Sequence, residues 1–235
     1  MTSPAAADVS DAFVSYERWG VVIPALRGVT LWIRPGEWLV VYGANGAGKS
    51  TLLDMLAGAR RPNQGSVRVF GSDPAKFSSR RRAQTIFRVR QNPEHGTAPT
   101  LTVREHLFLA DRSRPPRVRA SSGYYQALLD DRGLDVRLSQ LAGALSGGQR
   151  QLLALIMAEL SAAPLILLDE PFASLDIQRR KLAYATLKKL HAAERTLVLV
   201  THEPSDVTLY ATAVARVEEG HVTKDGTLAG EVRCG

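Results

Sequence analysis

The feature that most constrains this chain is a glycine-rich run that ends in lysine and serine. It spans residues 43–50 (GANGAGKS), fits the pattern GxxxxGK[ST], and directly follows an apolar run at 38–42 (WLVVY). A loop of this kind between a buried strand and a helix curls its backbone N–H groups around phosphate oxygens. A turn that binds nothing would need neither the lysine nor the hydroxyl. The motif therefore predicts an α/β fold that binds a nucleoside triphosphate.

The residue types in this loop also predict a metal ion. Lys49 is expected to reach the outer phosphates, and the Ser50 hydroxyl is expected to be a ligand of Mg²⁺. The bound species should therefore be a magnesium nucleotide. The residues expected to hold it at this loop are Gly43, Asn45, Gly46, Ala47, Gly48, Lys49, Ser50 and Thr51.

Alternating strand and helix patterns predict a doubly wound sheet around this loop. Short apolar runs rich in β-branched residues predict buried parallel strands at 38–42, 165–168 and 196–200. The helical patterns between them cover 49–56, 148–160 and 179–191. Sheets of this class bind their ligands at the carboxyl ends of the strands, so the polar residues at those ends are the candidates for chemistry.

Two further parts are predicted beside this P-loop NTPase (RecA-like) core. Short strand patterns at 12–16, 28–33 and 66–70 predict a small N-terminal antiparallel sheet. The stretch from about 100 to 145 has helical patterns and no buried-strand run, which predicts an inserted helical lobe. We expect residues 1–10 to form a loose tail, because they contain neither a basic leader nor an apolar run. We expect one domain at 11–230, with 11–95 and 146–230 as the core and 96–145 as the helical lobe.

Three polar residues follow the predicted buried strands. Asp169, facing Ser50, is expected to hold Mg²⁺, and Glu170 to accept a proton from the water that attacks the γ-phosphate. A strand that ends in Asp-Glu before Pro171 could instead begin a helix, since acidic residues and proline suit a first turn. His202 follows the third strand and could contact the phosphate, although an isolated histidine there is more often a loop residue.

Composition limits the possible ligands and cellular environment of the chain but does not decide its function. The net charge of +7 suits nucleic acid, anionic lipid or a polyphosphate ligand, and equally a solvated basic surface. The single cysteine, Cys234, excludes an internal disulfide and a cysteine-based metal site, and favours a reducing compartment. No apolar run reaches the roughly 18 residues that a membrane-spanning helix requires. A membrane role would therefore depend on a partner.

Residues 145–151 (LSGGQRQ) resemble the signature motif of the ATP-binding-cassette (ABC) ATPases. The serine and glycines stand at the start of a predicted helix, where a hydroxyl, bare N–H groups and the helix dipole suit an anion. An ordinary serine N-cap is the alternative. The resemblance implies that two subunits pack head to tail, as a homodimer or with a related subunit. It also implies that each ATP lies between one phosphate loop and the other chain's Ser146, Gly147, Gly148 and Gln149.

Other positions match the family's motifs in the same order along the chain. Gln91 resembles the glutamine switch and implies a metal contact with Ser50 and Asp169, and a catalytic role with Glu170 and His202. Asp176 resembles the aspartate loop that adjoins the nucleotide, and His202 the histidine switch. The family stacks an aromatic residue on adenine, for which Trp19 is the better candidate and Tyr16 the alternative.

The resemblance further implies an ATP-hydrolysing transporter subunit at the cytoplasmic face of the cell membrane. Polytopic permease subunits would be its partners, with their coupling helices received at residues 91–109, where Glu94, His95 and Arg104 could make contacts. That stretch, together with the QRQ at 149–151, looks like small-solute uptake systems, including amino-acid importers. Import is therefore the favoured direction, and a solute-binding protein is a further candidate partner.

Two other classes of function compete with this interpretation. A soluble cassette ATPase in cofactor assembly or nucleic-acid processing is motivated only by the basic charge, and no added nucleic-acid module is visible. A P-loop kinase or GTPase would leave residues 145–149 unexplained, and the GTPase motif NKxD is missing. Nucleic acid is therefore not an expected partner.

Overall fold

The computed structural model describes residues 5–111, 122–202 and 210–225, and Cys234 lies outside these ranges. A six-stranded sheet forms the centre of the molecule, with strand order β5-β6-β7-β3-β8-β9. Neighbouring strands are parallel except for β9, which runs antiparallel to β8. The strands are β3 (Trp38–Tyr42), β5 (Ile86–Val89), β6 (Leu165–Asp169), β7 (Thr196–Thr201), β8 (Ala213–Glu218) and β9 (His221–Asp225).

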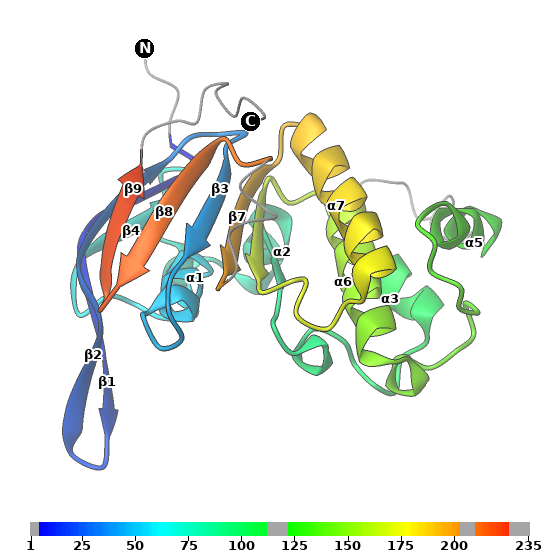
Figure 1. The fold of residues 1–235 in the computed structure, drawn as a ribbon, viewed down its shortest axis with the longest axis horizontal. Coiled ribbons are helices and arrows are strands. Elements are labelled where there is room, and N and C mark those ends of the chain that lie inside the picture. Colours follow the sequence, from blue (N-terminus) through cyan, green and yellow to red (C-terminus); the bar gives the residue numbers. More distant parts are fainter. Residues whose placement is uncertain (1–4, 112–121, 203–209, 226–235) are drawn as a thin grey trace.

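A three-stranded antiparallel sheet covers one face of this sheet, in the order β2-β1-β4. Its strands are β1 (Ala7–Arg18), β2 (Val21–Ile33) and β4 (Gln64–Val69). Because β1 already begins at Ala7, and Ala7 and Val9 are fully buried, the prediction of a loose tail over residues 1–10 is wrong from residue 7 onward. Helix α1 (Lys49–Leu56) lies between the two sheets (Figure 1).

The central strands bury both of their faces, which explains their continuous apolar runs. On β3, Leu39 and Val41 pack toward α1 and the antiparallel sheet, while Trp38 and Val40 pack toward the helices of the opposite face. The same alternation divides β6 and β7 between the two cores. This period of two fixes the register of the sheet, because a one-residue slip would exchange the two cores.

Helices cover the second face of the sheet and continue into a lobe at its edge (Figure 1). The longest are α6 (Gly147–Leu160) and α7 (Ile177–Ala192), and the lobe adds α3 (Val103–Ala110) and α5 (Ser122–Asp131). Capping boxes start α3 at Thr102 and α6 at Ser146. A short α2 (Ser79–Thr85) precedes β5, and single 3₁₀ turns lie at Pro74–Lys76, Pro93–His95 and Ala142–Ala144. The predicted fold of parallel core, antiparallel sheet and helical lobe is confirmed.

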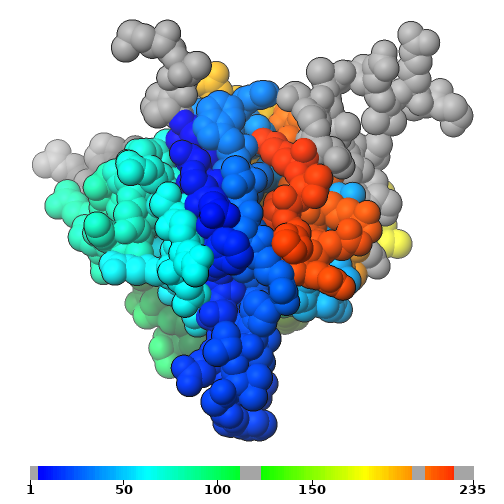
Figure 2. Space-filling view, turned by 90° about the vertical axis from the view of Figure 1, so that its left-hand side faces the viewer, coloured from blue at the N-terminus to red at the C-terminus, as the bar shows by residue number. Residues whose placement is uncertain are grey.

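The hairpin of β1 and β2 projects beyond the body of the molecule (Figure 2, in blue). Its turn contains Trp19 and Gly20, both with positive φ, and Trp19 is 91% exposed. Further back on the hairpin, Tyr16 pairs with Ile23 across the two strands. The part of the hairpin nearest the body therefore borders the carboxyl edge of the central sheet, and its tip lies away from it.

Candidate nucleotide-binding and hydrolysis site

The carboxyl ends of the parallel strands open onto a pocket of about 650 Å³. That volume lies within the usual range for small-molecule sites. Most of the residues that line it were predicted from the sequence, and the rest come from the hairpin of β1 and β2. The lining residues are Tyr16, Ile23, Pro24, Ala25, Asn45, Gly46, Gly48, Lys49, Ser50, Thr51, Gln91, Glu170 and His202.

The phosphate loop takes a conformation that needs glycine. Gly48 has a φ of 110°, in the region that L side chains rarely adopt, and a Cβ there would clash with the carbonyl oxygen of Ala25. The buried Lys49 ammonium donates to the carbonyl oxygens of Gly43 at 2.7 Å and Ala44 at 2.9 Å. The side chain of Lys49 thereby joins the end of the loop to its beginning. Its positive charge lies at the N-terminus of α1, the position at which loops of this kind bind phosphate oxygens.

Ser50 and Asp169 face each other, as predicted for a metal site. The Ser50 hydroxyl donates to Asp169 Oδ1 at 3.2 Å. Burial raises the pKa of the Asp169 carboxyl, and the guanidinium of Arg88 opposes that shift. A hydroxyl beside a carboxylate is the hard oxygen donor set that Mg²⁺ prefers, so these residues fit the ion. A bound magnesium ion would neutralise phosphate charge during transfer.

Arg88, on β5, is a residue that the sequence reasoning missed. Its Nη2 donates to Asp169 Oδ2 at 3.3 Å, and its Nη1 forms an ion pair with Asp54 of α1. The signal for it was a single arginine inside the short apolar run at 86–89 (IFRV). A charged residue there is expected only where a partner carboxylate is buried beside it.

Two polar side chains that follow neighbouring strands contact the Glu170 carboxylate. Gln91 Nε2 donates to its Oε2 at 3.2 Å, and His202 Nδ1 lies 3.2 Å from the same oxygen. The Glu170 backbone has a φ of 45°, a conformation that costs energy in a non-glycine residue and that clusters at functional sites. The arrangement fixes a carboxylate at the pocket edge, where it can accept a proton from a water molecule.

The predicted signature residues lie elsewhere on the chain's surface. Ser146 accepts the N–H of Gln149 at 3.2 Å, and Gln149 Oε1 accepts the N–H of Ser146 at 2.9 Å. Ser146 and Gly147 are exposed, and a Cβ on Gly147 would meet open space. These residues therefore cap α6 and present a bare helix start to solvent, but they do not line the pocket of their own chain.

Asp176 starts α7 close to this helix. Its carboxylate accepts the N–H of Arg179 at 2.9 Å and the Arg179 guanidinium at 2.7 Å. The hydrogen bond from the Arg179 N–H is the main cause that lowers the pKa of Asp176. Arg179 also lies against Gly148, so the two predicted motifs adjoin each other on one surface.

The two aromatic candidates for adenine take different places. Trp19 is at the hairpin tip and is not among the residues that line the pocket, so the structure does not support the sequence preference for it. Tyr16 lines the pocket, and its hydroxyl lies 3.2 Å from Thr51 Oγ1. The guanidinium of Arg60 stacks on the Tyr16 ring, 4.0 Å from its centre, which fixes the plane of the ring.

The ABC transporter family model matches residues 26–173, which include the phosphate loop, Gln91 and the signature. The chain belongs to the ABC transporter family. It is 35% identical over 202 residues to the lipoprotein-releasing system ATP-binding protein LolD 1 of Rhodopirellula baltica, covering 84% of this chain and 87% of that one. It is 32% identical to a tyrosine transport ATP-binding protein of Clostridioides difficile, covering 82% and 80%.

Longer relatives and solved structures agree with this family. The macrolide export protein MacB of Bordetella avium is 33% identical over 93% of this chain, which spans only 33% of that protein. A dimeric ATP-binding cassette in a post-hydrolysis state bound to ADP and Pi superposes with a TM-score of 0.81 at 26% identity, covering 96% of this chain and 100% of that one.

These findings make the chain an ABC ATPase that hydrolyses ATP, the ATP-binding unit of an ABC transporter. The predicted family and activity are confirmed at this level, whereas the matched relatives include both exporters and importers. Within the described ranges, no helix is both long and apolar enough to cross a bilayer.

Proposed function

We propose that the chain drives a membrane transporter by hydrolysing Mg-ATP in a dimer of two such chains. The observation that carries this proposal is the convergence of Gln91 and His202 on the Glu170 carboxylate beside the phosphate loop. Glu170 accepts a proton from the attacking water, while Gln91 and His202 hold its side chain in place. Ser50 and Asp169 hold the magnesium ion, and Lys49 neutralises the outer phosphates.

The second half of each site comes from the partner chain. Ser146, Gly147, Gly148 and Gln149 bind the phosphates of the nucleotide held by the other subunit, and Asp176 adjoins them across the interface. Two observations support this: Ser146 and Gly147 are exposed at a helix N-terminus, and none of the four signature residues lines the pocket of its own chain. ATP then favours the closed dimer, and hydrolysis releases it.

Dimer closure is tested with Ser146→Arg. The longer side chain occupies the phosphate position of the partner's site, so ATP should still bind each chain while ATP-dependent dimerisation is lost. Light scattering with and without ATP, in a background slowed by Glu170→Gln, measures this. The matched control is Ser139→Arg, an exposed position of the same lobe. Normal ATP-driven dimerisation of Ser146→Arg would refute the composite site.

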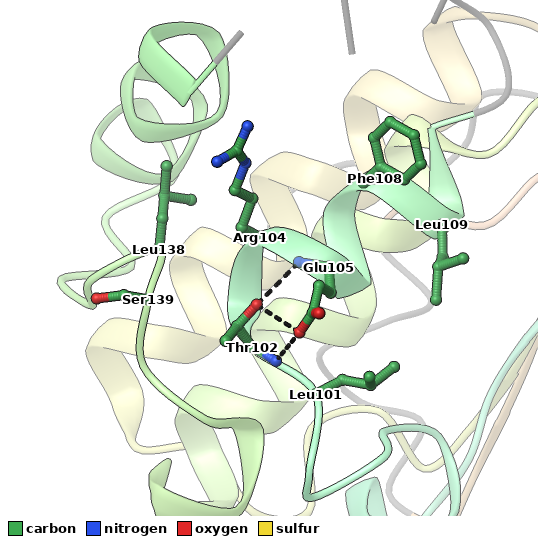
Figure 3. A pocket seen from close by; sticks show the side chains of 8 residues that line it. All are labelled: Leu101, Thr102, Arg104, Glu105, Phe108, Leu109, Leu138 and Ser139. Atoms are coloured by element: carbon green, nitrogen blue, oxygen red, sulfur yellow. Dashed lines mark hydrogen bonds between the residues drawn. The ribbon is translucent and has the colours of Figure 1, made fainter. Parts of the chain in front are cut away.

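The membrane partner is proposed to dock on the apolar groove along α3, which has a volume of about 770 Å³ (Figure 3). The groove is lined by Phe108 and Leu109 of the helix and by Leu101 just before it, and Leu138 lines it on the side of Arg104. These apolar side chains suit the apolar face of a short amphipathic helix, such as a permease coupling helix. Arg104 lies at the same groove and offers a charged contact.

One ion pair connects the 3₁₀ turn at Pro93–His95 with the signature helix. Glu94, three residues after Gln91, receives a hydrogen bond from the Arg150 guanidinium at 3.0 Å, next to the start of α6. A movement of this turn would therefore act on both Gln91 and the start of the signature helix. His95 ends the same 3₁₀ turn and is a further candidate contact.

Affinity purification of the tagged chain from its native membranes, with mass spectrometry and an ATPase assay, tests the transporter role. A polytopic permease is expected, placing the chain at the cytoplasmic face of the membrane. Leu109→Glu should lose the permease and keep the ATPase activity of the isolated chain, and Trp32→Glu, on the antiparallel sheet, should keep both. A co-purified solute-binding protein would support import, the direction that the importer-like stretch at 91–109 favours. Salt-dependent capture of DNA or RNA without a permease would contradict the transporter role.

A further inference from the structure

A buried arginine joins three elements of the hydrolysis site. Arg88 of β5 contacts Asp169 at the end of β6 and Asp54 in α1. The side chains of Arg88 and Asp169 are only 11% and 8% exposed. A buried charge strongly destabilises the folded state unless it is paired. The two carboxylates supply that pairing, and they set the position of the guanidinium between α1 and β6.

The two oxygens of the Asp169 carboxylate have different partners. Oδ1 accepts the hydroxyl of Ser50 at 3.2 Å, and Oδ2 accepts Nη2 of Arg88 at 3.3 Å. Rotation about the last torsion of an aspartate is soft, so a carboxylate without a fixed partner samples a broad range of orientations. A charged donor on Oδ2 restricts that rotation and keeps Oδ1 turned toward Ser50, the other expected magnesium ligand.

The position of Arg88 along the chain adds a second consequence. It lies three residues before Gln91, on the strand that leads to this switch residue, and Asp54 belongs to the helix that starts at Lys49. The ion pairs therefore tie the phosphate-loop helix, the metal carboxylate and the strand of the glutamine switch to one another. Arg88 itself is not among the residues that line the nucleotide pocket.

We propose that Arg88 is a positioning residue for the magnesium site, which holds Asp169 through Oδ2 and anchors that contact to α1 through Asp54. This inference rests on the proposed magnesium site at Ser50 and Asp169. Partners that orient a metal ligand typically change metal affinity or activity by about 10- to 100-fold when they are removed. A role in folding alone would lower the melting temperature and leave the dependence on magnesium unchanged.

The test compares nucleotide affinity with and without the metal. Binding of a non-hydrolysable ATP analogue is titrated in Mg²⁺ and in EDTA, and the magnesium concentration for half-maximal ATPase activity is measured in parallel. In Arg88→Met, the ratio of the two affinities should fall by about tenfold or more, and the magnesium requirement should rise by a similar factor. Affinity in EDTA should change by less than about threefold, because the phosphate loop remains intact.

Two further variants separate position from charge. Arg88→Lys keeps the charge but loses the planar fork that contacts both carboxylates, so it should restore only part of the magnesium effect. Asp54→Asn leaves the Asp169 contact in place and weakens its anchor, so it should shift the ratio in the same direction by a smaller factor. The matched control is Arg195→Met, which removes a half-buried arginine that donates to the carbonyl oxygens of Ser161 and Ala163. That control should leave the ratio unchanged.

An unchanged ratio in Arg88→Met, together with a lower melting temperature, would overturn the inference and leave Arg88 a structural residue. If Arg88→Met does not fold, Asp54→Asn and Arg88→Lys decide the question by the same ratio. Failure of the underlying magnesium site has a different signature: the wild-type chain itself would then bind the analogue equally well in Mg²⁺ and in EDTA.

Discussion

Replacing Glu170 with glutamine isolates the charge of the proposed base. The substitution keeps the size of the side chain and one oxygen that can accept a hydrogen bond from Gln91 or His202, both of which now reach Oε2 at 3.2 Å. What disappears is the negative carboxylate that can take a proton from water. The change therefore leaves the pocket's shape intact and removes one chemical capability.

The expected loss follows from the role of a positioned general base. Such a group contributes about 10²- to 10⁴-fold to the rate, which corresponds to about 2.7–5.4 kcal/mol of the activation barrier. Binding of ATP should not weaken, because Lys49, Ser50 and the loop N–H groups are unaltered. The removal of a negative charge near the γ-phosphate should if anything favour the bound state.

Phosphate release at saturating Mg-ATP measures the rate, and titration with a fluorescent nucleotide measures the affinity. Glu194→Gln is the matched control, since Glu194 is an exposed glutamate in the turn before β7, at the end of the sheet opposite the pocket. Wild-type phosphate release by Glu170→Gln would remove Glu170 from its assigned role. A comparable loss in Glu194→Gln would show that the rate reports folding and not the base.

Three further predictions concern adenine, packing and a helix cap. Tyr16→Ala should weaken ATP binding by about 1–3 kcal/mol, the usual worth of a base stacked on an aromatic ring, while Trp19→Ala at the exposed hairpin tip should not; equal nucleotide titrations of the two variants would contradict this. Leu107→Ala, at a fully buried position of α3, should lower the free energy of unfolding in urea by about 2–5 kcal/mol, and a loss below about 1 kcal/mol would show a loosely packed lobe. A hydrogen bond from the N–H of Thr102 lowers the pKa of Glu105 in the folded state. Ionised Glu105 therefore stabilises the folded state fully above its unfolded pKa of about 4.3, and this stabilisation is lost as the pH falls through the lower folded pKa. Thermal melts should show Glu105→Gln less stable than wild type at neutral pH and equal to it in acid, and a difference independent of pH would refute the capping role.

The elements whose bounds were predicted most closely are those marked by one strong local sequence pattern. Strand β3 and helix α1 begin and end where the apolar run and the phosphate-loop pattern place them. Strand β5 was not predicted, because Arg88 interrupts its apolar run and the local pattern then resembles a polar segment. Strand β1 extends further toward the N-terminus than predicted, since Ala7 pairs with both Ile33 and Val69 across long-range contacts that a local pattern does not contain.

The choice between the aromatic residues depends on hairpin geometry. Both Tyr16 and Trp19 stand ahead of the phosphate loop in an otherwise polar stretch, and spacing along the chain does not separate them. The register of β1 with β2 does, because Tyr16 pairs with Ile23 beside the pocket and Trp19 falls in the turn beyond the strands. Register is fixed by the whole sheet, so this contact could be identified only from the structure.

The topology of the sheet explains why Gln91, Glu170 and His202 lie together and why Ser146 does not lie beside them. Gln91, Glu170 and His202 follow three strands, β5, β6 and β7, that are neighbours in the sheet, so their side chains meet wherever those strands end. Ser146 instead begins a helix that covers one face of the sheet, and nothing in that topology turns it toward its own phosphate loop. The proposed composite site assigns this exposed, capped helix start, with its bare glycine N–H groups, to the nucleotide of another chain.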